Sequence, residues 1–248
     1  MPPFSWPIGS PATAPPLQHT DLHVWAASLA APPIPTDQLL EALTAVERAE
    51  AERHAFEWGR ARRLASRGLL RRLLGAYLGL APRAVPITAG RFGKPALRPG
   101  ATTAQVCFNV SHADDLVLFA VSHGREVGID VEHVHHRDDA ADVAASFFTP
   151  SEARALEAVA PRLRDEAFYR CWTRKEAYLK ARGAGLSMAL NSVDVGVESR
   201  TGFVTIRPSA PGDSPGWVSC DLSPAPGFLA AVVVASEAPR LLCWHWCG

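Results

Sequence analysis

The chain has 248 residues, of which 48% are hydrophobic and 20% charged, and its 25 basic and 25 acidic residues leave no net charge. A chain of this length buries a sizeable core and accommodates one large domain or two smaller ones. Because no overall field of either sign is present, we expect neither nucleic acid nor a membrane among its partners.

The first 20 residues are predicted to be a Pro-rich leader, because they hold six prolines and little periodic apolar pattern. Residues 21–124 are expected to form an N-terminal subdomain. Its first strand is predicted at 22–29, where apolar and polar residues alternate weakly. Thr36 or Asp37 is expected to cap a short helix that follows.

A second helical pattern extends from Val46 to Leu80, with a break predicted near Gly59 or Gly68 and an end at Gly79. Residues 47–72 within it contain eight arginines against four glutamates. This segment is therefore predicted to be a basic helix that is able to meet an anion.

A turn and a pair of strands are predicted next. Gly90–Pro95 places two glycines and a proline around one lysine, which is typical of a turn. Residues 106–110 and 116–122 indicate two strands, joined by a hairpin-like connection at Ser111–Asp115. An acidic strand at 127–132 follows.

Residues 125–248 are expected to form a C-terminal subdomain. It is predicted to have a polar loop at 133–142, a helix that starts within 147–152, and a longer helix from Asp165 that stops at Gly183 and Gly185. Four more strands are predicted, at 193–197, 203–207, 218–222 and 228–235. Helices with short, mostly antiparallel strands in each half indicate an α+β fold, with the acidic strand where the two halves meet.

The cysteines and the apolar runs bear on the compartment. Five cysteines form no paired framework, which fits a reducing environment. A signal peptide is not expected, and the run Phe228–Ala235 is too short to span a bilayer. We therefore expect a cytoplasmic protein. Cys243, His245 and Cys247 suggest zinc, but their spacing is not a standard one, and a packed strand is the favoured interpretation.

Four charged residues suggest a metal-dependent phosphate site. Asp130 and Glu132 are two apart on a predicted strand and so point to one side. Trp172, Glu176 and Lys180 share one face of a predicted helix. Carboxylates without a cysteine or histidine partner favour Mg²⁺, or Mn²⁺, over zinc. Taken alone, Asp130 and Glu132 are more often a solvated strand face, and Glu176 and Lys180 a surface ion pair. Only their combination favours a metal-dependent phosphate site.

Other residues are candidates for contacts to a phosphate, but each of them alone also has an ordinary structural explanation. Lys94 is either an exposed turn lysine or an anion contact. Arg53, Arg60 and Arg63 are either solvated helix positions or a phosphate clamp. A hydrolase is not indicated by Ser111–His112, because no nucleophile elbow surrounds the serine; the pair is able instead to donate hydrogen bonds to a phosphate.

Together these motifs resemble 4′-phosphopantetheinyl transferases, and most closely the surfactin-synthetase-activating type, a single chain built as a pseudo-dimer of two similar α/β subdomains. The resemblance covers about residues 90–187 and, more loosely, extends back to residue 50. It rests on these segments, in the order and spacing of that family: Gly93-Lys94-Pro95, Phe108-Asn109-Val110-Ser111-His112, Val127-Gly-Ile-Asp130-Val-Glu132, Phe147-Phe148 with Glu152, and Phe168 to Lys180.

The resemblance implies transfer of the phosphopantetheine arm of coenzyme A to a serine of an apo acyl or peptidyl carrier protein, with release of adenosine 3′,5′-bisphosphate. It implies that Asp130, Glu132 and Glu176 hold Mg²⁺ and that Lys180 neutralises the pyrophosphate. Glu176, or a water on the metal, would take the serine proton. The 3′-phosphate and the nucleotide would be contacted by Ser111, His112, one or more of Arg53, Arg60 and Arg63, and Gly93-Lys94-Pro95.

The resemblance further implies a monomer, because a pseudo-dimer has no need to pair, and a carrier surface near 133–148. That segment is equally well explained as a loop followed by core aromatics. Two other functions stay open: an Mg²⁺-dependent phosphodiesterase acting on carrier-bound phosphopantetheine, and a coenzyme A-binding module without turnover. The carrier, whether of fatty-acid, polyketide, peptide or siderophore synthesis, is not specified by the sequence, although the type indicates secondary metabolite biosynthesis.

Overall fold

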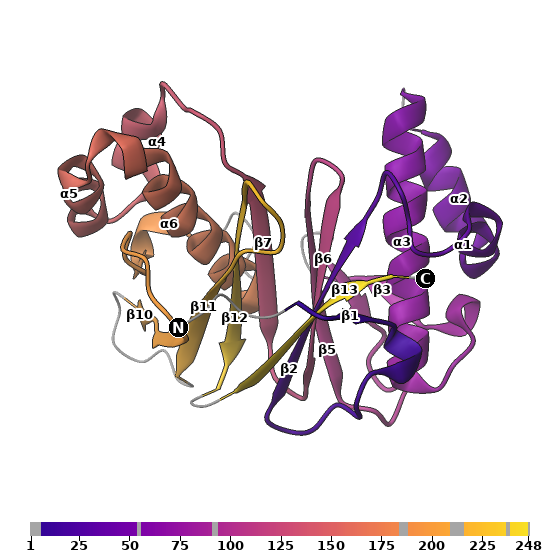
Figure 1. Cartoon of the computed structure of the whole chain (residues 1–248). Coiled ribbons are helices and arrows are strands. Elements are labelled where there is room, and N and C mark those ends of the chain that lie inside the picture. Colours follow the sequence, from indigo (N-terminus) through magenta and orange to yellow (C-terminus); the bar gives the residue numbers. More distant parts are fainter. Residues whose placement is uncertain are drawn as a thin grey trace.

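Two sheets stand side by side at the centre of the computed structural model, with helices on their outer sides (Figure 1). The structure describes residues 6–53, 56–90, 94–183, 188–208, 216–236 and 239–247. Gly93 and Gly185, named above, therefore lie outside the described residues. Most strand pairings in the described chain are antiparallel, and each half combines one central sheet with covering helices, so the predicted α+β pseudo-dimer architecture is confirmed.

The first sheet has the strand order β1-β13-β2-β6-β5. Its antiparallel part is built from β2 (Asp21–Ser28), β6 (Leu116–His123) and β5 (Val106–Ala113). The two remaining strands, β13 (Arg240–Trp246) and β1 (Ile8–Gly9), run parallel to their neighbours. The last strand of the chain, β13, therefore belongs to the first sheet, although it follows residue 124 in the sequence. The predicted leader, in turn, contributes β1.

Three helices accompany this sheet: α1 (Thr36–Ala42), α2 (Ala45–Glu52) and α3 (Glu57–Leu78). The predicted helical stretch is divided into α2 and α3, and α3 begins at Glu57, two residues before Gly59, near which one of the two possible breaks was expected. There is no break near Gly68, since α3 continues through it. Gly68 serves close packing instead, because a Cβ there would lie 2.9 Å from the Leu39 carbonyl oxygen of α1. The helix does end at Gly79, whose φ of 64° suits glycine.

The second sheet has the order β7-β12-β11-β9 and is wholly antiparallel. It consists of β7 (Val127–His133), β12 (Phe228–Ala235), β11 (Trp217–Leu222) and β9 (Phe203–Thr205). Two short pairs complete the strands: β3 (Ile87–Ala89) with β4 (Pro95–Leu97), and β8 (Val193–Asp194) with β10 (Arg207–Pro208).

Helices α4 (Ala140–Phe147), α5 (Pro150–Ala158) and α6 (Pro161–Arg182) belong to the second half. The loop predicted at 133–142 therefore ends three residues early, where α4 begins at Ala140. Helix α6 begins four residues before the expected Asp165, because Pro161 occupies its first turn, where the missing N–H of proline costs nothing. Among the described residues, no helix combines the length and the apolar character that crossing a membrane requires.

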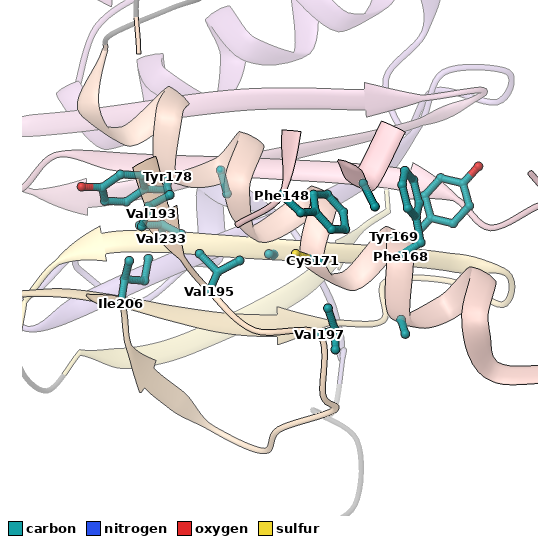
Figure 2. Packing of buried hydrophobic residues seen from close by; sticks show 14 of the residues in the cluster. Phe148, Phe168, Tyr169, Cys171, Tyr178, Val193, Val195, Val197, Ile206 and Val233 are labelled. Carbon is teal, nitrogen blue, oxygen red and sulfur yellow. The ribbon is translucent and has the colours of Figure 1, made fainter. Parts of the chain in front are cut away.

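Alternate residues of the central strands divide the core into three layers. Val127, Ile129 and Val131 of β7 join Leu22, Val24 and Leu118 of the first sheet in a core shared between the sheets. The outer face of the second sheet packs under α6 through Ala231 and Val233, together with the aromatic residues shown in Figure 2. The outer face of the first sheet packs on α3. This sandwich holds the edge strands β5 and β7 against each other at the centre of the molecule.

Candidate active site

Helix α6 comes unusually close to strand β7, and a glycine is the reason. A Cβ on Gly128 would lie 2.0 Å from the Ala177 carbonyl oxygen and 2.4 Å from the Ala181 nitrogen, so only glycine fits between the two backbones. Two residues further along the same face of β7 stands Asp130. Glu176 and Lys180, one helical turn apart, immediately precede the two contacting residues Ala177 and Ala181 on α6.

The predicted helix face is confirmed by burial. Trp172, Glu176 and Lys180 are half-buried, whereas the neighbouring positions on α6 are mostly buried. The C-terminal half of the helix is therefore embedded in the second subdomain except along this one line, which borders the junction with β5 and β7.

A hydrogen-bonded cluster of three side chains joins the two halves. The Lys180 Nζ lies 2.6 Å from the Asp130 Oδ1 and 2.9 Å from the Ser111 Oγ, and the Ser111 hydroxyl donates to the same Asp130 oxygen at 2.9 Å. Asp130 and Ser111 are only 5% exposed. The cluster thus sets one carboxylate and one ammonium at the boundary between β5 and β7.

Ser111 and His112 are strand residues, which corrects the predicted hairpin connection. Strand β5 continues to Ala113, which pairs with Leu116 of β6, and the turn is made at Asp114, whose φ is 49°. Because successive strand residues point to opposite faces, Ser111 is buried against Asp130 while His112 faces a cavity beside α3.

Asn109 completes the junction and was not singled out from the sequence. Its buried Oδ1 accepts a hydrogen bond from the backbone N–H of Ile129 at 2.9 Å. Strand β7 is an edge strand, so this amide has no neighbouring strand of its own sheet to donate to. Asn109 and Ser111 of β5 therefore hydrogen-bond to two successive residues of β7, Ile129 and Asp130.

Glu132 and Glu176 carry raised pKa values. Burial raises the pKa of both carboxyls, and the negative charge of Asp130 raises them further, while Lys180 acts in the opposite direction. A hydrogen bond from Trp172 also lowers the pKa of Glu132, and Glu176 raises it. Three carboxyl groups that repel one another beside a single lysine favour the arrival of a cation.

The carboxylate oxygens of Asp130, Glu132 and Glu176 are chemically of the kind that a divalent metal such as Mg²⁺ binds. The Asp130 Oδ2 is buried and has no hydrogen-bond partner, and oxygen ligands from carboxylates are those that Mg²⁺ prefers. No ready-made group of three or more His, Cys, Asp or Glu ligands exists among the described residues. The same holds for Cys243, His245 and Cys247, which suggested zinc in the sequence: they form no such group, and Cys243 lies buried in strand β13.

A cavity of about 540 Å³ opens beside His112, between α3 and β5. Its cationic residues are Arg62, Arg63 and Arg67, and Pro95 of β4 also borders it. Partial burial and the nearby charges of Lys180, Arg63 and Arg62 lower the pKa of His112, although its side chain reaches solvent. The three arginines give this side of the cavity a positive charge close to the Asp130–Lys180 cluster.

The structure separates the predicted arginines. Arg63 lines the cavity, whereas Arg53, the exposed residue that ends α2, and Arg60 do not. Arg62 and Arg67, which the sequence did not single out, do line it. The sequence contains no signal that selects them from the eight arginines of this segment.

Lys94 is not among the residues that line the cavity. Its Nζ donates to the carbonyl oxygens of Val127 at 3.3 Å and Lys180 at 2.5 Å, and burial lowers its pKa. The side chain ties β4 to the start of β7 and to the end of α6. This geometry supports a structural role for the lysine of the turn.

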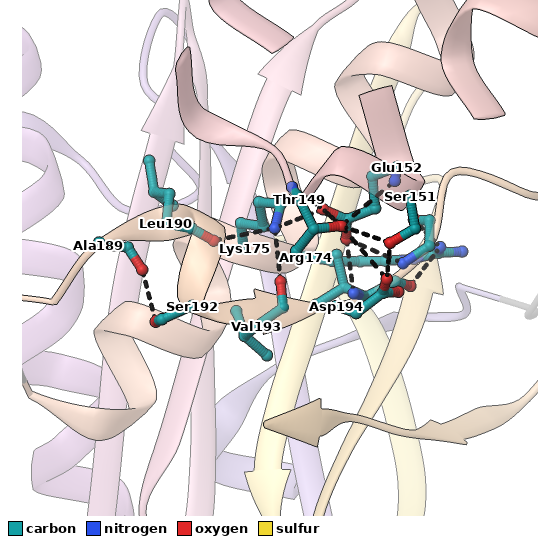
Figure 3. A network of polar contacts seen from close by, with 12 residues as sticks. Thr149, Ser151, Glu152, Arg174, Lys175, Ala189, Leu190, Ser192, Val193 and Asp194 are labelled. Atoms are coloured by element: carbon teal, nitrogen blue, oxygen red, sulfur yellow. Dashed lines mark hydrogen bonds and ion pairs between the residues drawn. The ribbon is translucent and has the colours of Figure 1, made fainter. Parts of the chain in front are cut away.

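Behind the site, a buried ion pair anchors α6 (Figure 3). Lys175 and Glu152 are both buried, 2.7 Å apart, and Lys175 also donates to the carbonyl oxygens of Leu190 and Val193. Glu152 closes the capping box of α5 with Thr149. Through Lys175, Glu152 thus fixes the helix that carries Glu176 and Lys180.

Comparison with known families identifies the class of this protein. Residues 126–232 match the model of the 4′-phosphopantetheinyl transferase superfamily, and residues 33–124 match the 4′-phosphopantetheinyl transferase N-terminal model. The chain therefore belongs to the 4′-phosphopantetheinyl transferase superfamily and is an enzyme of that class.

Individual relatives extend the match over most of the chain. The 4′-phosphopantetheinyl transferase HetI of Nostoc sp. (strain PCC 7120) is 33% identical over 226 residues, covering 91% of this chain and 92% of that protein. A putative 4′-phosphopantetheinyl transferase of Synechocystis sp. is 35% identical over 68% of each chain. A 4′-phosphopantetheinyl transferase of Bacillus subtilis is 29% identical over 69% of this chain and 73% of its own length.

Proposed function

We propose that this enzyme transfers the 4′-phosphopantetheine arm of coenzyme A to a serine of an apo carrier protein and releases adenosine 3′,5′-bisphosphate. The observation that carries the proposal is the Asp130–Ser111–Lys180 cluster, set between a group of carboxylates and a cationic cavity. We assign it to the single-chain, surfactin-synthetase-activating type, acting as a monomer in the cytoplasm, because both halves of the pseudo-dimer are present in one chain.

Asp130, Glu132 and Glu176 would hold Mg²⁺, or Mn²⁺ in its place. When bound, such an ion supplies positive charge to the pyrophosphate and relieves the repulsion among the three carboxylates. The unpartnered Asp130 Oδ2 and the raised pKa values of Glu132 and Glu176 support this assignment.

Each protein group then has one task. In the transfer, the carrier serine oxygen forms a bond to the phosphorus of the phosphopantetheine phosphate, and the bond from that phosphorus to the bridging oxygen breaks. Glu176, whose raised pKa suits a base, accepts the serine proton. Lys180 neutralises charge on the departing 5′-phosphate. Arg63 and His112, with Arg62 and Arg67, bind the 3′-phosphate.

The test is incubation with coenzyme A, Mg²⁺ and a panel of apo carrier proteins, followed by mass determination of the carriers. A gain of one phosphopantetheine supports the proposal. Loss from a holo carrier instead indicates a phosphodiesterase, and coenzyme A binding without any mass change indicates a binding module.

Metal removal and Asp130→Ala supply the controls. Chelation should abolish transfer, with recovery on addition of Mg²⁺ or Mn²⁺, and Asp130→Ala should lose transfer while remaining folded. Near-wild-type transfer by Asp130→Ala would reject the site assignment.

A further inference from the structure

The ammonium group of Lys180 already balances the charge of the carboxylate that is proposed to bind a metal ion. Its Nζ lies 2.6 Å from the Asp130 Oδ1, and the Ser111 hydroxyl contacts both groups at 2.9 Å. The Asp130 side chain is only 7% exposed, so little water screens this ion pair. A lysine of the chain thus supplies a positive charge at the same residue to which a metal ion would bring one.

The same ammonium acts on the two neighbouring carboxyl groups. Burial and the negative charge of Asp130 raise the pKa of Glu132 and Glu176, and Lys180 acts against both effects. A divalent ion held by these carboxylates would also favour their charged forms. Lys180 and the ion are therefore alternative sources of positive charge for one group of carboxylates. Because like charges repel at short distance, Asp130 is unfavourable as a partner for both at once.

Lys180 has the freedom to exchange one partner for another. Its side chain is 30% exposed and its ammonium ends a flexible aliphatic stem, while its backbone is fixed in the last turn of α6. Lys94, which lies nearby, is not able to replace it, because its Nζ donates to the carbonyl oxygens of Val127 and Lys180. Of these two lysines, Lys180 is therefore the one whose charge is able to move.

We propose that Lys180 holds the place of the metal ion on Asp130 and must turn away from that carboxylate before the ion binds. This inference rests on the proposed function and adds the regulation of its site: the carboxylates stay neutralised until the metal replaces the lysine. The same exchange frees the ammonium for the pyrophosphate, which is its proposed task in the transfer. Loading of the metal and positioning of Lys180 are then one event.

The experiment is a titration of the full chain with Mn²⁺, without coenzyme A or carrier, in which electron paramagnetic resonance measures the free ion. Lys180→Met and Lys180→Gln remove the charge and keep a flexible side chain, whereas Lys180→Arg keeps the charge. Lys94→Met is the matched control at the neighbouring lysine. The double variant that combines Lys180→Met with Asp130→Ala shows which binding occurs at this site. Circular dichroism checks that each protein is folded.

Both neutral variants should bind Mn²⁺ roughly tenfold or more tightly than the wild type, because no ammonium then has to leave Asp130. Lys180→Arg and Lys94→Met should bind the ion no more tightly than the wild type. The gain should disappear in the double variant, since the carboxylate for which lysine and ion compete is gone. Transfer by the neutral variants should still fall, because the charge that acts on the leaving group is missing.

Weaker or equal Mn²⁺ binding by the two neutral variants would overturn the inference, and no detectable binding by any of the proteins counts as equal. Weaker binding would show that Lys180 holds the carboxylates in place for the ion. If the wild type transfers phosphopantetheine but the neutral variants bind Mn²⁺ no more tightly, only the competition is rejected. If the wild type modifies no carrier although the neutral variants bind Mn²⁺ more tightly, the proposed function is rejected and the competition stands.

Discussion

Asp130 binds Ser111 and Lys180 through the same carboxylate oxygen, Oδ1, and its Oδ2 is buried without a partner. An unpaired buried carboxylate oxygen is costly unless a donor or a cation reaches it. Two lysines meet near this point, but only one faces the cluster. Lys180 directs its ammonium to Asp130, whereas Lys94 directs its own to backbone carbonyl oxygens.

This contrast gives a prediction for the two lysines. Lys180→Ala should lower kcat by about 100-fold or more and change coenzyme A affinity much less, because its charge acts on the leaving group. Lys94→Ala should instead lower the free energy of unfolding by about 1–2 kcal/mol, through the two lost hydrogen bonds, and leave kcat nearly unchanged. Transfer kinetics, calorimetry and denaturant unfolding of both variants measure this. The reverse pattern would contradict the assignment.

Asn109 should act as a positioning residue, since it holds the amide next to Asp130. Asn109→Ala should lower kcat about tenfold or more with little change in KM for coenzyme A, because Asp130 loses its fixed place. Phe108→Leu, on the core-facing side of the same strand, is the matched control. It should lower stability but not kcat, measured at a temperature where both variants are folded. A similar kcat in the two variants would reduce Asn109 to a structural role.

At the scale of elements, the approach of α6 to β7 depends on Gly128. Gly128→Ala should destabilise the protein by about 3 kcal/mol or more, because the added Cβ would meet helix backbone rather than a flexible side chain. Gly59→Ala in α3 is the control. A Cβ there meets nothing within 4 Å, so this change should stabilise by about 0.5–1 kcal/mol. Denaturant unfolding midpoints of the two variants measure the difference. Equal midpoints would show that the close approach of α6 to β7 at Gly128 does not limit stability.

Elements that depend on local sequence patterns were predictable from the sequence. Features that depend on contacts between distant segments were not. The helix period placed Trp172, Glu176 and Lys180 on one face, and β12 was predicted at its observed bounds. The cavity arginines were not predictable, because α3 has several arginines and only the packing of β5 against it selects Arg62 and Arg67. Strand pairing with β6, likewise invisible locally, places Ser111 inside β5.

At the scale of the whole molecule, a buried polar group links β2, α3 and β13. His23 of β2 is fully buried, and its Nδ1 lies 2.7 Å from the Tyr77 hydroxyl of α3. Asp21, also buried, forms a two-bond ion pair with Arg240 of β13, and Arg125 donates to its backbone oxygen. Burial lowers the pKa of His23 to about 4, although Asp21 acts in the opposite direction.

This shift predicts acid sensitivity. The unfolded chain takes up a proton at His23 near pH 6.5 and the folded chain only near pH 4, so the stability present above pH 6.5 is lost as the pH falls towards 4. The loss should be of the order of 3 kcal/mol. His23→Gln should remove this part of the pH dependence, as measured by urea unfolding between pH 7 and 4. An unchanged pH profile in the variant would exclude His23 as its source.

Strand β13 has one more consequence, for whether the two halves can exist apart. It pairs with β2 on one side and β1 on the other, although the second sheet precedes it in the chain. A fragment ending at residue 124 would lack the strand between β1 and β2, and a fragment beginning at 125 would carry that strand with no sheet to receive it. Coexpressed as two polypeptides, the fragments should reassemble by exchange of this strand, whereas neither should show cooperative unfolding alone. The molecule is thus an interlocked pair of halves, and a linker cut between them releases no independent module.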